Sequence, residues 1–331
     1  MAQAPVRVGF VGTGGIAQHH IRKLVEIPEC KIVALCDIDA ARVKQVADPL
    51  GAAVFTDAKR MLDEAKLDAL FVCVPPFAHG DVEVRAAEKG LHLFVEKPVN
   101  LYIPEARKAW AAIKKAGVLT QTGYSLRYLA SAIQLKKLLE SLPVGSAHIT
   151  RWGGLPGSPW WRNYAQSGGQ LVEMTTHQVD LLRWVMGEIE AVSASYSLNR
   201  LLKDQEGVSV PDTQAALLIF KSGASATVST SCATGKAGMS DVHFVVKDGR
   251  VYWKHDQLQA FPEGQFQIPP PPSEVPSVDA AFIRAVFSGN PALLKSPFDD
   301  ALKSAAVTLA CNQSAAEGGR LVKLDEVLGD L

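Results

Sequence analysis

The sequence predicts a fold of the α/β plus α+β class, in which a doubly wound parallel sheet precedes a mainly antiparallel, open sheet covered by helices. Three observations support this. The 331 residues are enough for two domains, each with its own core. Over residues 1–125, short apolar runs alternate with amphipathic segments, which is typical of βαβ units. Over residues 126–331, consecutive strand patterns are joined by tight turns, which is typical of antiparallel pairing.

The N-terminal domain, residues 1–125, is expected to consist of alternating strands and helices. The apolar run at 6–11 predicts a buried strand, and the amphipathic stretch at 16–26 predicts the helix that follows it. The same alternation predicts strands at 31–36, 69–74, 92–95 and 118–122, and helices at 40–50, 81–89 and 104–116. Gly90 follows the 81–89 helix, where a glycine commonly ends a helix.

The C-terminal domain, residues 126–331, begins with an expected helix at 130–141, a strand near 148–152 and a loop at 153–169. A helix at 174–186 then ends at Gly187. Asp248-Gly249 separates two strand patterns and indicates a hairpin. The expected strands are 191–198, 214–220, 224–231, 242–246 and 250–253, and the last helices are 278–288 and 298–317. We expect this domain to bind substrate and to mediate oligomerisation.

Composition excludes several classes of partner. The chain has 34 Lys and Arg against 34 Asp and Glu, so it lacks the basic excess of a nucleic-acid binder. Its five cysteines are odd in number and far apart, which predicts reduced thiols in a cytoplasmic protein. We expect no signal peptide, and because no uninterrupted apolar run reaches membrane length, we expect no membrane partner.

A glycine motif indicates a nicotinamide cofactor. Residues 12–17 read GTGGIA, a G-x-G-x-x-A pattern between a predicted strand and a predicted helix. Gly12 permits the turn, while Gly14 lets the backbone approach a pyrophosphate at the helix N-terminus. Asp37 ends the second strand, twenty residues beyond Ala17, where an acid binds the adenosine ribose diol. This is the Rossmann fingerprint, and because Asp37 would repel a 2′-phosphate, it favours NAD over NADP.

Later motifs resemble the glucose–fructose oxidoreductase/inositol dehydrogenase (Gfo/Idh/MocA) family. Residues 74–79 (VPPFAH) are similar to its T-P-N-x-x-H segment, and 87–98 (AEKGLHLFVEKP) to its A-G-K-H-V-x-x-E-K-P run. Residues 123–128 (GYSLRY) are similar to G-F-N-x-R-Y, and 168–177 (GGQLVEMTTH) to G-G-x-L-x-D-x-G-x-H. Glu173 and Thr175 depart from the usual Asp and Gly. The resemblance spans nearly the whole chain and implies an oxidoreductase acting on sugars or cyclitols.

The expected catalytic residues are Lys97, Glu173 and His177. Lys97 follows a strand on the cofactor side of the sheet, and the resemblance implies that it contacts the substrate oxygen and the nicotinamide ribose. Glu173 and His177 are four residues apart and share a face if the helix starts at or before Glu173. An imidazole can take a hydroxyl proton, and a carboxylate can orient it. Asp180 is the alternative orienting group, or caps local structure; we expect no metal.

Further residues are expected to line the cofactor and substrate sites. Trp160 and Trp161 offer flat apolar faces for a sugar or cyclitol, or alternatively pack an interface. Tyr124 and Arg127 are expected to line the substrate site, although Arg127 has an interdomain ion pair as its alternative. We expect His79 near the nicotinamide, and His19 and His20 on the outer part of the first helix. The expected cofactor contacts are Gly12, Gly14, Gly15, Ile16, Asp37, Pro75, His79, Glu96, Lys97 and Arg162.

Together these features predict an NAD-dependent dehydrogenase that oxidises a secondary alcohol of a sugar, sugar acid or cyclic polyol. Two alternatives remain at the level of sequence. One is an enzyme with tightly bound NAD that carries out redox-neutral sugar conversion, and the other is a non-catalytic NAD-binding sensor or scaffold. Because an open antiparallel sheet leaves one face to be covered, we also expect a homodimer or homotetramer.

Overall fold

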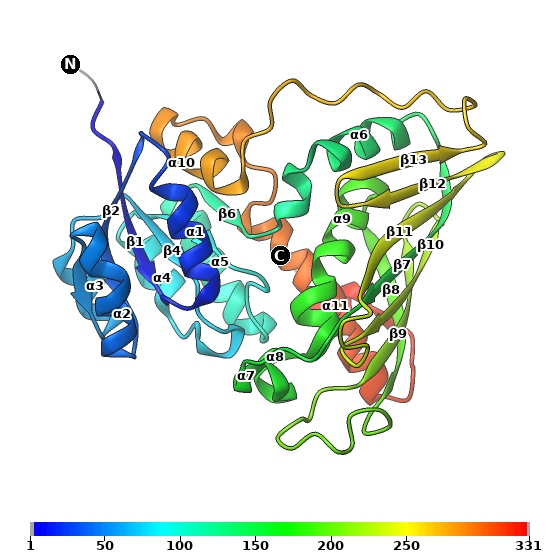
Figure 1. The fold of residues 1–331 in the computed structure, drawn as a ribbon, viewed down its shortest axis with the longest axis horizontal. Helices are drawn as coiled ribbons and strands as arrows, with labels where there is room; N and C mark the ends of the chain where they lie inside the picture. Colours follow the sequence, from blue (N-terminus) through cyan, green and yellow to red (C-terminus); the bar gives the residue numbers. More distant parts are fainter. Residues whose placement is uncertain (1–2, 330–331) are drawn as a thin grey trace. The chain divides into compact units, whose positions relative to one another are not determined.

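The computed structural model describes residues 3–329, which form two compact units (Figure 1). Unit 1 comprises the chain up to Gly123 together with Pro276–Ala301, and unit 2 comprises Tyr124–Val275 and the chain from Leu302 onward. The first division lies close to the expected boundary at 125/126. The return of Pro276–Ala301 to unit 1 differs from the expectation that residues 126–331 form one domain.

Unit 1 contains a six-stranded sheet in the order β3-β2-β1-β4-β5-β6, in which every pair is parallel. Its strands are β1 (Val6–Val11), β2 (Cys30–Cys36), β3 (Ala53–Phe55), β4 (Ala69–Val72), β5 (His92–Val95) and β6 (Thr120–Thr122). Its helices are α1 (Gly15–Leu24), α2 (Ala40–Ala47), α3 (Ala58–Glu64), α4 (Val82–Glu88), α5 (Ile103–Ala116) and α10 (Val278–Ser288). Short 3₁₀ turns occur at Asp48–Leu50, Pro76–Ala78 and Pro291–Leu293. The doubly wound parallel sheet predicted from sequence is confirmed.

Stacked aromatic rings explain why helix α10 belongs to unit 1. Phe10, Phe71 and Phe94 lie on β1, β4 and β5, and successive ring centroids are 4.8 and 4.5 Å apart. Phe282 of α10 approaches Phe71 and Phe94 edge-on at 5.5 and 5.7 Å. All four side chains are fully buried. Each such ring stabilises the fold by roughly 1.5–3 kcal/mol through burial, so α10 completes this core.

Unit 2 contains an eight-stranded sheet in the order β13-β12-β11-β7-β10-β9-β8-β14. Only β7 and β10 are parallel, and the other pairs are antiparallel, as the sequence predicts. The strands are β7 (Val144–Trp152), β8 (Ile189–Ser197), β9 (Thr213–Phe220), β10 (Ser225–Ser231), β11 (Met239–Val246), β12 (Gly249–Lys254), β13 (Gln257–Phe261) and β14 (Val322–Lys323). The β11–β12 hairpin turns at Lys247–Asp248, with Asp248 at a φ of 60°.

Helices complete unit 2. They are α6 (Ala130–Leu139), α7 (Pro159–Arg162), α8 (Tyr164–Ser167), α9 (Thr176–Met186), α11 (Phe298–Ala316), which starts in unit 1, and α12 (Leu324–Leu328). A 3₁₀ turn occupies Ser125–Tyr128, and a π-helical turn at Leu171–Thr175 leads into α9. Figure 1 shows α6 and α9 on one side of the sheet. Within residues 3–329, no helix is both long and apolar enough to span a membrane.

Candidate functional site

The glycine loop after β1 leaves room for a phosphate group. Gly12 has a φ of +91°, and a Cβ there would lie 2.4 Å from the Cys73 carbonyl oxygen, so glycine is required. By contrast, a Cβ on Gly14 or Gly15 would meet no atom within 4 Å. This open space faces the start of α1, where backbone N–H groups lack helical partners. The loop therefore has the form and donors of a pyrophosphate cradle.

Asp37, directly after β2, is held by several donors. Its carboxylate accepts hydrogen bonds from the Thr13 backbone N at 2.8 Å and the Thr13 hydroxyl at 2.9 Å. Arg42 of α2 donates through Nη2 at 2.6 Å and Nε at 3.1 Å. Burial would raise the pKa of Asp37, but these hydrogen bonds, with one from the Asp39 backbone, lower it to about 2. Asp37 is thus ionised at neutral pH, and no sequence motif predicts its partner Arg42.

Lys97 follows β5 at the carboxyl edge of the same sheet. Its backbone N donates to Oε2 of the preceding Glu96 at 3.3 Å, and the Lys97–Pro98 peptide is cis. The Glu96 carboxylate is buried beside Gly123, where an added Cβ would lie 2.0 Å from Glu96 Oε1. A glycine is therefore required at position 123 to make room for this carboxylate. The Glu96 carboxylate in turn holds the backbone at Lys97 through the hydrogen bond to its N–H.

His20 and Asp279 complete a buried charged cluster with Glu96. Nε2 of His20 lies 3.0 Å from Glu96 Oε1, and Nδ1 contacts Asp279 of α10. Burial would lower the pKa of His20, but hydrogen bonds to Asp279 and Glu96 outweigh it and raise the pKa to about 9. The expectation that His20 lies on the outer part of helix α1 is wrong, because this face packs against α10 and the side chain is buried. His19, in contrast, is exposed.

Pro75 and His79 follow β4, the neighbour of β1 and β5. Pro75 is half-buried at the strand end. His79 is only 2% exposed, and its Nδ1 lies 2.5 Å from the carboxylate of Glu83 on α4. This pair fixes the His79 ring inside unit 1, and its place near the nicotinamide stays a prediction.

Glu173 lies within the π-helical turn rather than in a regular helix. Its Oε2 accepts a hydrogen bond from Nε1 of Trp161 at 2.8 Å. Trp161 is 2% exposed and packs with Val210 and Cys232 in the core of unit 2. The Trp161 ring therefore positions Glu173 from inside the unit and is buried away from solvent, whereas Trp160 beside it is half-buried.

His177 lies in the first turn of α9, four residues beyond Glu173. The Tyr124 ring meets His177 edge-on, with centroids 6.0 Å apart. Tyr124 is itself fully buried, and its hydroxyl shares a 2.9 Å hydrogen bond with Thr176. Tyr124, which was expected to line the substrate site, thus packs beside His177.

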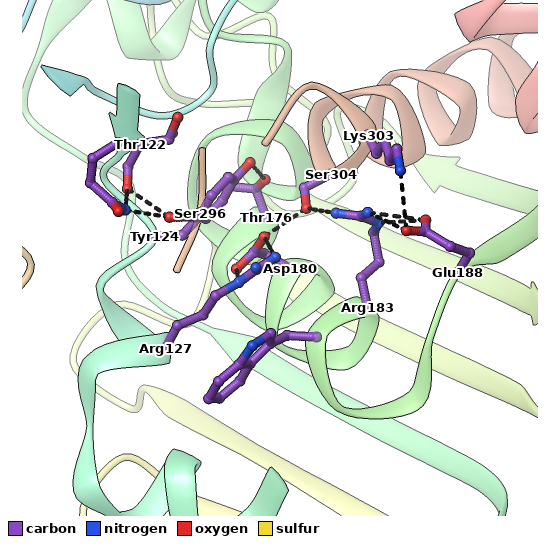
Figure 2. A network of polar contacts seen from close by, with 12 residues as sticks. Thr122, Tyr124, Arg127, Thr176, Asp180, Arg183, Glu188, Ser296, Lys303 and Ser304 are labelled. Atoms are coloured by element: carbon purple, nitrogen blue, oxygen red, sulfur yellow. Dashed lines mark hydrogen bonds and ion pairs between the residues drawn. The ribbon is translucent and has the colours of Figure 1, made fainter. Parts of the chain in front are cut away.

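Asp180 and Arg127 form a buried ion pair within unit 2 (Figure 2). Arg127 donates to both carboxylate oxygens, at 2.8 and 2.6 Å. Ser304 of α11 donates to Asp180 at 2.7 Å, and Arg183 donates in turn to Ser304. Burial raises the pKa of Asp180 against the opposing effect of Arg127. Both residues of this pair belong to unit 2, so it is not the interdomain pair that was the alternative for Arg127.

The remaining predicted residues lie on the surfaces of their units. Ile16 is exposed in the first turn of α1. Arg162 ends α7, where its Nε donates to the Pro156 carbonyl at 2.9 Å. The structure thus gathers Gly12, Gly14, Asp37 and Lys97 at the carboxyl ends of β1, β2 and β5. It separately gathers Trp161, Glu173 and His177 around the start of α9.

Comparison with known proteins identifies the family. The model of an oxidoreductase family with an NAD-binding Rossmann fold (Gfo/Idh/MocA) matches residues 6–124, and the Gfo/Idh/MocA C-terminal domain model matches residues 137–251. The chain belongs to the Gfo/Idh/MocA family of oxidoreductases. The resemblance seen in the sequence motifs is thereby confirmed, and the chain is an enzyme of the NAD(P)-dependent class.

Relatives within the Gfo/Idh/MocA family include enzymes named for inositols. The chain is 31% identical over 236 residues to scyllo-inositol 2-dehydrogenase (NAD(+)) of Bacillus subtilis, covering 68% of this chain and 67% of that one. It is 29% identical over 231 residues to myo-inositol 2-dehydrogenase of Thermotoga maritima, covering 68% of both. The chain thus aligns with about two thirds of the length of these relatives.

Solved structures share the complete fold. GenD2 from gentamicin A biosynthesis, in complex with NAD, has a TM-score of 0.81 and 25% identity, with 97% of each chain covered. A structure from Desulfitobacterium hafniense described as an NADPH-dependent oxidoreductase has a TM-score of 0.81 at 20% identity, covering 98% of this chain and 99% of that one. The family model and the NAD complex of GenD2 support a nicotinamide cofactor, and the descriptions of these two structures name NAD and NADPH respectively.

Proposed function

We propose that this Gfo/Idh/MocA enzyme oxidises a secondary alcohol of a sugar, sugar acid or cyclic polyol, with NAD as the acceptor. The observation that carries the proposal is the grouping of the glycine cradle, Asp37 and Lys97 at the carboxyl ends of adjacent parallel strands, where ligands of open α/β sheets bind. The inositol specificity in the names of its relatives supports a polyol-type substrate.

The residues present fit a dinucleotide. The space before Gly14 and Gly15 would accept the pyrophosphate, and Asp37 would accept hydrogen bonds from the adenosine ribose. Pro75 and Glu96 stand at neighbouring strand ends, where we place the nicotinamide half. When bound, the nicotinamide supplies the acceptor for the two electrons that leave the substrate carbon.

The choice of NAD follows from charge. Because the pKa of Asp37 is lowered to about 2, its carboxylate is negative at physiological pH and opposes a 2′-phosphate. Arg42 offsets part of that charge, since it is paired to the same carboxylate. We therefore expect NAD to be preferred.

Proton transfer is assigned to Lys97, His177 and Glu173. Removal of a hydride from a carbinol carbon requires loss of the hydroxyl proton, which a neutral imidazole can accept near pH 7. Glu173, fixed by Trp161, would orient His177 and stabilise its protonated form. Asp180 is already engaged by Arg127 and Ser304, which favours Glu173 for this role. The Lys97 ammonium would stabilise negative charge developing on the substrate oxygen.

Assays with a substrate panel test this proposal. Purified protein is incubated with NAD and inositols, hexoses or uronates, and NADH formation is followed by absorbance. We expect turnover with at least one polyol or sugar, and loss of most turnover in His177→Ala with NAD binding retained. His19→Ala, a change at an exposed histidine on α1, serves as the control.

Other outcomes point to the alternatives. Substrate conversion without NADH release indicates redox-neutral chemistry with tightly held cofactor. NAD binding without conversion of any substrate indicates a sensor or scaffold. Full activity of His177→Ala contradicts the assignment of the proton acceptor.

A further inference from the structure

A pocket in unit 2 has a positively charged lining. It has a volume of about 440 Å³ and lies among the end of β7, the π-helical turn and the start of β11. Arg151 and Lys254 line it, whereas no Asp or Glu does so among the described residues. This volume lies in the range of small-molecule sites, and its charge suits an anion.

The Arg151 guanidinium is the central feature of this pocket. The side chain is half-buried, and burial lowers its pKa against the opposing charge of Glu173. Within residues 3–329, no carboxylate lies within ion-pair distance of it, and its hydrogen bond to the Trp152 carbonyl is long, at 3.4 Å. A guanidinium has five N–H donors, and it is costly to bury it without acceptors. The Arg151 guanidinium therefore has N–H donors that could bind the acceptor atoms of a ligand.

The strand register explains why Arg151 faces this pocket. Arg151 pairs with Ser240 of β11 and Thr230 of β10. It follows Ile149 by two residues, and therefore lies on the same face of the sheet as that buried side chain. Thr230 on this face bonds to Thr175 in the π-helical turn at 2.7 Å. The face of the sheet that bears Arg151 is therefore the one against which the catalytic turn packs.

The pocket also adjoins the candidate catalytic carboxylate. Gln170 precedes the π-helical turn, and Met174 follows Glu173 within it, and both side chains line the pocket. Gln170 is 2% exposed, and the Ser240 hydroxyl is fixed by Gln178 Nε2 at 3.0 Å. A ligand held at Arg151 would thus lie beside the π-helical turn that carries Glu173 and leads to His177.

We propose that this pocket binds an anionic group of the sugar substrate, either the carboxylate of a sugar acid or the phosphate of a sugar phosphate, through Arg151. The inference deepens the proposed function and rests on it. Arginine pairs with both groups in a bidentate manner, with charge-assisted hydrogen bonds. Lys254, exposed at the end of β12, adds attraction for the same anion.

An alternative role for Arg151 is electrostatic support of Glu173 alone. In that case, loss of the charge would change turnover of charged and neutral substrates equally. With a specific anion site, loss of the charge lowers the turnover of anionic substrates far more than that of neutral ones. The ratio between the two substrate types therefore separates the two roles.

The experiment compares D-glucuronate, D-glucose 6-phosphate and D-glucose as substrates of the full chain with NAD. The variants are Arg151→Gln, Arg151→Lys and Lys254→Gln. Lys247→Gln is the control, because it removes one exposed positive charge at the opposite end of the β11–β12 hairpin. In Arg151→Gln we expect kcat/KM for the preferred anionic sugar to fall about 10–100-fold through KM, and kcat/KM for glucose to fall much less. Arg151→Lys should recover part of the loss, and Lys254→Gln should show a smaller one.

Equal losses for anionic and neutral sugars, or a wild-type preference for glucose, would overturn the proposal. The glucuronate and glucose 6-phosphate arms distinguish a carboxylate from a phosphate. If no sugar reduces NAD, the proposed function fails, and calorimetric titration with the same three sugars still tests the pocket. Anion binding that weakens in Arg151→Gln but not in Lys247→Gln supports the site, and binding no tighter than that of glucose rejects it. Thermal melting of each variant verifies that it is folded.

Discussion

The salt bridge between Asp37 and Arg42 places opposite charges where the adenosine ribose is expected. In Asp37→Ser, the carboxylate is lost and the Arg42 guanidinium is left to pair with a 2′-phosphate. We expect the ratio of kcat/KM for NADP to that for NAD to rise about 10–100-fold, which is the range for one or two charge-assisted hydrogen bonds. Steady-state kinetics with both nucleotides measure this ratio.

Asp63→Ser is the matched control for that change, since it removes an exposed carboxylate of α3 in the same unit. It should leave the nucleotide ratio unaltered. A ratio that stays the same in Asp37→Ser would show that the carboxylate does not select the cofactor.

His20 links protonation to the stability of unit 1. Its pKa of about 9 lies above the ordinary 6.5, so protonation favours the folded state. This stabilisation is fully present below about pH 6.5 and is lost as the pH rises through about 9. It corresponds to about 3 kcal/mol. We expect the difference in melting temperature between the wild type and His20→Gln to be largest near pH 6 and to shrink by pH 9.5.

The neighbouring His19→Gln removes an exposed imidazole from the same helix and serves as the control for His20. Its melting temperature should follow that of the wild type across the pH series. A deficit in His20→Gln that does not vary with pH would mean that the ring contributes by packing against Phe94, 4.9 Å away, and not by charge.

Among the elements, those with a strong apolar pattern were predicted well. The run at 6–11 became β1 with the same bounds, and the hairpin around Asp248 was found. Strand β3 and helix α3 were not anticipated. Strand β3 has only three residues at a sheet edge, two of them exposed, so a buried apolar run is absent. The pattern of apolar residues predicts a helix or strand only where burial requires apolar side chains at regular positions.

Helix α1 carries a sequence pattern that predicts which of its residues are buried. Its buried residues are Ala17, His20, Ile21 and Leu24, which follow the spacing of one helical face. That spacing places His20 inward. Its partner Asp279, however, is 259 residues away in the chain, and a contact over such a separation has no local signature.

The π-helical turn also escaped sequence reasoning. Glu173 and His177 were expected on one face of a regular helix, but a π-helical turn from Leu171 to Thr175 precedes α9. A π-helix has more residues per turn, so the spacing of four no longer fixes their relative direction. The Trp161 hydrogen bond to Glu173 comes from tertiary packing, which the motif does not encode.

At the scale of the whole molecule, the division into a nucleotide-type unit and a unit with an open sheet was foreseen from length and texture. The return of Pro276–Ala301 to unit 1 was not. The reason is physical. Phe282 packs on Phe71 of β4 and Phe94 of β5, and this contact between distant parts of the chain has no local signature in the sequence. Long-range packing of this kind decides which segments belong to a unit.

The open face of the unit 2 sheet leads to the prediction of a homo-oligomer. Leu217, Thr227, His148, His243 and Tyr252 pair across five strands and form a row on one face. Leu217 and, farther along β11, Val245 are 39% and 55% exposed. A sheet face that carries exposed apolar side chains commonly pairs with its own copy about a two-fold axis. We expect light scattering to give the mass of two or four chains.

Substitution of Val245 by Asp tests which face is involved. In an interface related by a two-fold axis, the new carboxylate would be present in both subunits, and each copy would lose its contact with water. Val245→Asp should therefore lower the mass toward that of one chain. Val54→Asp is the control, because Val54 is 43% exposed on β3 at the edge of the other sheet. A wild-type protein that is monomeric at micromolar concentration would contradict the prediction of a homo-oligomer. If neither variant changes the mass of the oligomer, the interface lies on another surface. The apolar side chains on this face are then ordinary exposed residues.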